Sequence, residues 1–139
     1  MLSRRMVLII TAVAETLTGL AFLLAPNATS GLLFGAHPDH VGLMIGRLAG
    51  VALVAIGISC WGAGRDPGGT AQAATFRGAT LYNAGAGVLL LLFAVTGQAS
   101  GFVIWVAGVF HLIMAGFAAA RRGAGARHPA AAGGKPSSS

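Results

Sequence analysis

Four strongly polar side chains interrupt four long apolar stretches of the sequence, one in each: Glu15, Arg47, Asn83 and His111. Such groups are costly in hydrocarbon, so they face a protein interior, a partner or a water-filled cavity. At a rise of about 1.5 Å per residue, Glu15, Asn83 and His111 reach a similar depth if the stretches are spanning helices. Arg47 lies roughly 6 Å further toward one end than Glu15, a gap that a long guanidinium side chain can bridge. We therefore predict a buried cluster with Glu15 paired to Arg47 and with Asn83 and His111 hydrogen-bonded around them.

Three neighbouring side chains are predicted to line this cluster. Thr11 and Thr18 share a helix face with Glu15, and Tyr82 precedes Asn83. A carboxylate at this depth can fasten helices together, bind a proton or anchor a ligand. An arginine partner favours the fastening role, and the two other roles stay open.

Other chemistry is weakly indicated. His37, Asp39 and His40 are candidate metal ligands, but neighbouring loop residues rarely reach one metal ion with suitable geometry. His111 is the only histidine in an apolar stretch, so one chain cannot supply two histidines to a haem there. Cys60 is the only cysteine, and no nucleophile–base–acid pattern is visible. We expect no metal, no bound cofactor and no enzymatic activity of the chain alone.

The elements that must position the cluster follow from composition. The chain is 55% hydrophobic and 9% charged, whereas a soluble domain carries about 25% charged residues. The apolar stretches predict an all-α, four-transmembrane-helix bundle formed by residues 1–120 as one domain, with spans at about 6–25, 41–61, 74–97 and 101–120. Residues 27–40 are predicted to connect the first two spans through a short interfacial turn. Residues 121–139 read as a disordered, basic cytoplasmic tail.

Charge placement predicts orientation. In a four-span arrangement, Arg4, Arg5, Arg65, Arg77 and the basic residues after 120 all fall on one side, and the opposite connectors hold no Lys or Arg. By the positive-inside rule, both termini are cytoplasmic in a multi-pass protein of the plasma membrane, the inner membrane of a bacterium. The net charge of +6 is then explained by contacts with lipid headgroups rather than nucleic acid. The expected partners are the lipid bilayer and either another membrane protein or a second copy of the chain.

Small residues accompany the polar ones. Gly42, Gly46 and Gly50 form a small-residue ridge that allows close helix approach. Glu15 and Asn83 are each followed four residues later by a glycine, a weak sign of an internal repeat.

Two family resemblances add expectations. Ala14 and Glu15 resemble the Ala-Glu pair in the first helix of the small multidrug resistance transporters, which implies Glu15 as a proton and substrate site. The second span departs from that family, because it carries Arg47 and glycines in place of aromatic residues. More broadly, residues 23–26 (LLAP), 32–35 (LLFG) and 46–47 (GR) resemble the uncharacterised four-helix bacterial membrane proteins of the DoxX-like group. That resemblance implies the fold and no established activity, although some members are linked to membrane redox complexes.

Three functional hypotheses follow. The leading hypothesis is a structural or accessory membrane subunit whose polar cluster organises the bundle. The alternative is a small-solute or proton-coupled transporter that uses Glu15, and the third is an accessory to a membrane redox complex.

Overall fold

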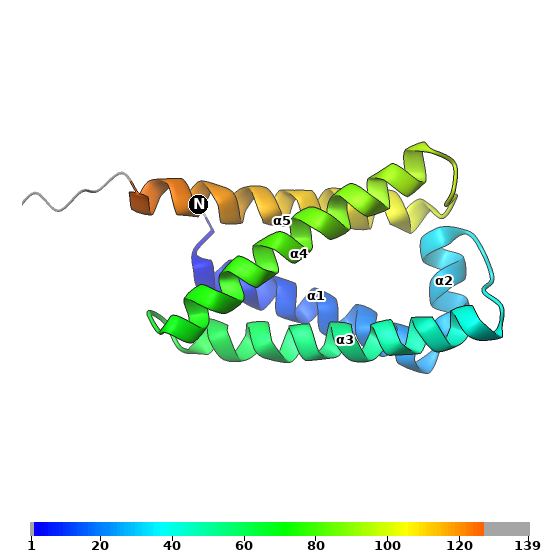
Figure 1. Cartoon of the computed structure of the whole chain (residues 1–139), viewed down its shortest axis with the longest axis horizontal. Coiled ribbons are helices and arrows are strands. Elements are labelled where there is room, and N and C mark those ends of the chain that lie inside the picture. Colours follow the sequence, from blue (N-terminus) through cyan, green and yellow to red (C-terminus); the bar gives the residue numbers. More distant parts are fainter. Residues whose placement is uncertain (1, 127–139) are drawn as a thin grey trace, which may run out of the picture.

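The computed structural model describes residues 2–126, with the side chains described as far as Arg121, and its regular elements are all helices. In chain order they are α1 (Arg4–Leu24), α2 (Pro26–Phe34), α3 (His40–Arg65), α4 (Thr70–Val95) and α5 (Phe102–Ala126) (Figure 1). The helices α1, α3, α4 and α5 are long and apolar enough to cross a membrane, which confirms the prediction of four long apolar helices. Helix α5 continues to Ala126, so residues 121–126 are helical rather than disordered. The rest of the predicted tail lies outside the described residues.

Local signals turn the predicted connector into an ordered short helix, α2. Pro26 occupies the first turn of α2, where a missing N–H costs nothing. Gly35 ends α2 in the left-handed conformation, with φ of +72°. Asp39 then caps α3 by accepting a hydrogen bond of 2.8 Å from Gly42 N. These signals place α2 at one end of the bundle, the α2 end (Figure 1).

The long helices form two pairs, because α1 packs mainly on α3 and α4 mainly on α5. A Cβ atom added at Gly50 of α3 would lie 2.7 Å from the carbonyl oxygen of Gly19 in α1. One added at Gly87 of α4 would lie 3.0 Å from the carbonyl oxygen of Gly108 in α5. Each seam therefore depends on glycine to let two backbones approach. Gly19 of α1 lies one helical turn after Glu15, and Gly87 of α4 lies one helical turn after Asn83.

Two apolar cores close the bundle at its opposite ends. The larger lies where α1 begins and α5 ends, which we call the terminal end; its buried residues are Val7, Leu8, Ala12, Cys60, Ala63, Phe76, Ala79, Met114 and Ala118. The smaller lies at the α2 end, where Leu33 and Phe34 pack against Ala94, Ala99 and Ile104. A backbone hydrogen bond of 2.9 Å from Ser100 N to Phe34 O ties α2 to the α4–α5 connection. The space between these cores contains the candidate site.

Candidate functional site

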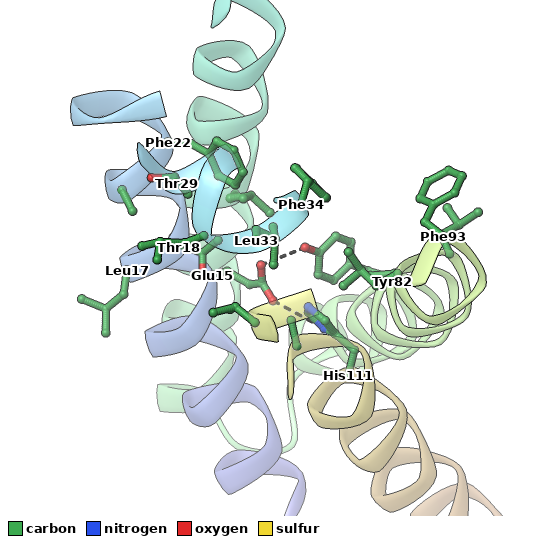
Figure 2. Close-up of a pocket in the computed structure, with 18 residues that line it drawn as sticks. Glu15, Leu17, Thr18, Phe22, Thr29, Leu33, Phe34, Tyr82, Phe93 and His111 are labelled. Atoms are coloured by element: carbon green, nitrogen blue, oxygen red, sulfur yellow. Dashed lines mark hydrogen bonds and ion pairs between the residues drawn. The ribbon is translucent and has the colours of Figure 1, made fainter. Parts of the chain in front are cut away.

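A cavity of about 620 Å³ lies between the two helix pairs and extends from the middle of the bundle to α2 (Figure 2). Ligand sites in proteins occupy roughly 300–1,000 Å³, so the volume suits a small organic molecule. Most of its wall is aliphatic or aromatic, and the residues that line it are Glu15, Leu17, Thr18, Ala21, Phe22, Thr29, Leu32, Leu33, Phe34, Leu53, Tyr82, Ala86, Leu89, Leu90, Phe93, Val103, Ala107 and His111.

The Glu15 carboxyl group forms the polar end of this cavity. Glu15 is 2% exposed, and its Oε2 atom accepts a hydrogen bond of 2.8 Å from the Tyr82 hydroxyl. The other oxygen, Oε1, is buried and has no hydrogen-bond partner among the described residues. Figure 2 shows the carboxyl group between the side chains of Tyr82 and His111. A buried acceptor without a donor is costly, about 1–3 kcal/mol for a neutral group and more for a charged one. One Glu15 oxygen therefore lacks a hydrogen-bond donor among the described residues.

Asn83 fixes the orientation of the His111 ring. The Asn83 amide nitrogen donates to Ala79 O at 2.7 Å, which leaves Asn83 Oδ1 as an acceptor. His111 Nδ1 lies 2.9 Å from that oxygen and so donates its proton there. The same Nδ1 is 3.9 Å from Glu15 Oε1, too long for a good hydrogen bond. His111 therefore covers Oε1 without satisfying it.

The ring of Tyr82 completes the cluster. It packs edge-on against His111, with the ring centroids 5.6 Å apart and the planes at 85°. With its hydroxyl on Glu15, Tyr82 of α4 connects residues from α1 and α5. Tyr82, which the sequence predicted only to line the cluster, is thus the direct hydrogen-bond partner of Glu15.

The predicted pairing of Arg47 with Glu15 is wrong. Arg47 is exposed on α3, and the described residues contain no ion pair between it and Glu15. Helix α3 turns Gly50 toward α1, and its exposed neighbours Met44 and Leu48 share the outward side with Arg47. From an apolar outer face, a long arginine side chain can extend to the membrane interface. The cluster is consequently built by α1, α4 and α5 without α3.

The remaining predicted residues have separate places. Thr18 lines the cavity, whereas Thr11 is fully buried one turn beyond Glu15 toward the terminal end. His37 Nδ1 lies 3.1 Å from Asn27 Oδ1, and Asp39 is used as the α3 cap. No three His, Cys, Asp or Glu side chains are grouped to hold a metal ion within the described part of the chain.

Sequence reasoning missed the apolar part of the site. Phe22, Phe34 and Phe93 come from α1, α2 and α4 and line one cavity, although they are far apart in the chain. Whether these residues line the cavity depends on how α2 folds back against the bundle, and the only sequence signal for that fold is the apolar centre of the connector.

The sequence matches no protein-family model, no curated protein and no solved structure.

Proposed function

We propose that this chain is a multi-pass membrane protein that binds a small, largely apolar molecule and holds its polar end at Glu15, as a small-solute transporter would. The observation that carries this proposal is the buried carboxyl oxygen Oε1, left without a partner at the end of an apolar cavity. Cavities with apolar walls and a few convergent polar groups are the usual form of a small-molecule site.

The chemistry of the cavity supports a ligand with a donor at one end, preferably a protonated amine. Glu15 is the only acidic residue in the lining, and no Lys or Arg lines it among the described residues. A carboxylate binds an ammonium through a charge-assisted hydrogen bond and repels an anion. The rings of Phe22, Phe34 and Phe93 add apolar surface and aromatic faces that attract cations. Because Oε1 is covered, we expect a small rotation of Glu15 or His111 when the ligand's donor reaches it.

The absence of Arg47 from the cluster also supports a binding role. A fastener would be satisfied internally, as the predicted Glu–Arg pair would have been. Instead, the Glu15 carboxyl group has one donor within the described part of the chain and lines a cavity. The hypotheses of an accessory subunit and of a redox accessory stay predictions from the sequence. The expected partner, another membrane protein or a second copy of the chain, also stays a prediction.

We also propose that both termini are cytoplasmic, in a bacterial inner membrane, so that the cavity opens in the half of the membrane away from the cytoplasm. The support is the position of Arg4, Arg5, Arg65 and Arg77, all at the terminal end. Green fluorescent protein fused after residue 139 is expected to fluoresce in bacterial cells, since it folds in the cytoplasm. An active alkaline phosphatase fusion at the same position would reverse this orientation.

The binding proposal is tested with three naphthyl probes of similar size that differ at the polar end: 2-naphthylmethylamine, 2-naphthylmethanol and 2-naphthoate. We expect the amine to raise the thermal unfolding temperature of the purified protein most, the alcohol less, and the carboxylate not at all. The physical reason is that the amine donates as a cation, the alcohol donates as a neutral group, and the carboxylate carries the same charge as Glu15. An equal or larger shift with the carboxylate would contradict the proposal.

A further inference from the structure

We infer that the Tyr82 side chain closes a passage between the cavity and a second cleft, and that its hydrogen bond to Glu15 holds this passage closed. The inference rests on the proposed binding function and extends it to movement of the ligand along the membrane normal.

The second cleft lies between α3 and α4 and has a volume of about 430 Å³. Its lining residues are Ala55, Ile56, Ser59, Cys60, Thr75, Gly78, Ala79 and Tyr82. They belong to the later turns of α3 and the earlier turns of α4, so the cleft extends from Tyr82 toward the terminal end. The cavity extends from Tyr82 the other way, toward α2. The two spaces therefore lie in succession along the bundle.

The Tyr82 side chain lies between the cavity and the second cleft, and we call it the partition. Among the described residues it alone lines both spaces. The helix that carries it makes most of its contacts with α5 and fewer with α3 or α1. Figure 1 shows α4 running obliquely across the bundle, from the end of α3 to the start of α5. A single side chain of α4 thus faces both spaces.

The partition is held by two contacts on its cavity side, the hydrogen bond to Glu15 Oε2 and the edge-on packing against His111. A donor that reaches Oε1 requires the rotation of the Glu15 carboxyl group described above, and this rotation draws Oε2 away from the Tyr82 hydroxyl. Binding at Glu15 therefore weakens the contact that keeps Tyr82 in place.

The cleft has room for the released ring. Gly78 lies one turn before Tyr82, and a Cβ atom added there would meet nothing within 4 Å. Helical side chains lean toward the preceding turn, so the space over Gly78 is where a Tyr82 ring released from Glu15 would move. Ligand binding and opening of the partition are in this way coupled through one hydrogen bond.

Cys60 provides a native reporter for the passage, because it lines the second cleft, is 1% exposed and is the only cysteine of the chain. Spheroplasts that express the full chain are treated from outside with 2-(trimethylammonium)ethyl methanethiosulfonate, a cationic and membrane-impermeant thiol reagent. The fraction of modified Cys60 is then measured by mass spectrometry after purification. Because the reagent does not cross lipid, its route to Cys60 in the proposed orientation leads through the cavity and past Tyr82.

We expect Tyr82→Ala to raise the modification rate at least tenfold, since it removes the partition. Tyr82→Phe keeps the ring and loses the hydrogen bond, so its rate is expected between those of Tyr82→Ala and the native chain. Leu81→Ala, a change at the neighbouring exposed position, is expected to leave the rate unchanged. Addition of 2-naphthylmethylamine is expected to raise the rate of the native chain.

Equal rates for the native chain, Tyr82→Phe and Tyr82→Ala would overturn the passage. Tyr82→Phe decides the matter if Tyr82→Ala does not fold, because an unchanged Tyr82→Phe rate shows that the hydrogen bond closes nothing. Failure of the proposed function is distinguishable: the amine would then give no thermal shift, whereas failure of the passage alone leaves that shift intact and the modification rates equal.

Discussion

Glu15→Gln is expected to lower the affinity for 2-naphthylmethylamine at least tenfold while leaving the protein folded. Glutamine has the same shape, and its carbonyl oxygen can still accept the hydrogen bond from Tyr82. The variant loses the negative charge that faces the ligand. Hydrogen bonds to charged groups contribute about 1.5–3 kcal/mol, and each 1.4 kcal/mol is a factor of about ten in affinity.

The measurement is an equilibrium titration of the amine into purified native and variant protein, with Asp66→Asn as the matched control. Asp66 is the C-cap residue of α3 and does not line the cavity, so its loss removes one carboxylate without touching the site. We expect the control to bind like the native chain. If Glu15→Gln binds the amine normally but unfolds at a much lower temperature, Glu15 is a fastener, as the sequence first indicated.

Gly50→Leu is expected to separate α1 from α3 and to lower the unfolding temperature by about 10 °C or to prevent folding. A Cβ atom at position 50 would lie 2.7 Å from Gly19 O and 3.1 Å from Leu23 N. Both obstacles are backbone atoms, so no side-chain rotation relieves them. Overpacking typically costs about 1–3 kcal/mol, and this site belongs at the upper end of that range.

Gly62→Leu is the matched control in the same helix, because a Cβ atom there would meet nothing within 4 Å. We expect its thermal unfolding, followed by circular dichroism in detergent, to stay within a few degrees of the native chain. Equal unfolding temperatures for the two leucine variants would show that the α1–α3 seam does not depend on close backbone approach at Gly50.

The four long helices could be predicted because membrane spans are encoded locally. A run of about 20 apolar residues needs no knowledge of its neighbours to be recognised. The depth of Glu15, Asn83 and His111 followed from the same count, and the structure brings these three together.

The partner of Glu15 could not be predicted, because depth does not determine the direction in which a helix turns its side chains. Arg47 has a suitable depth, yet α3 uses the side near Gly50 for α1 and leaves Arg47 exposed. Tyr82 lies next to Asn83 in sequence, about 100° around the helix, and this rotation carries its hydroxyl to Glu15. Which helix faces which is decided by glycine contacts between segments far apart in the chain.

The cavity could not be predicted from the sequence either. It exists because the helix pairs are closed by separate cores at the two ends and because α2 folds across one of them. The apolar centre of the connector, Leu32–Phe34, indicated burial at an interface but not that Leu33 and Phe34 line a cavity. Closure of this kind is a property of the packed bundle and not of any one segment.

The ratio of the affinities for 2-naphthylmethylamine and 2-naphthoate, measured by titration of the native protein in lipid nanodiscs, tests the central claim most directly. The two probes share the apolar body that fills the cavity and differ in the sign of the charge presented to Glu15. We predict that the amine binds at least tenfold more tightly than the carboxylate, and that Glu15→Gln removes most of this difference. Equal affinities for the two probes in the native protein would contradict Glu15 as the polar end of a binding site.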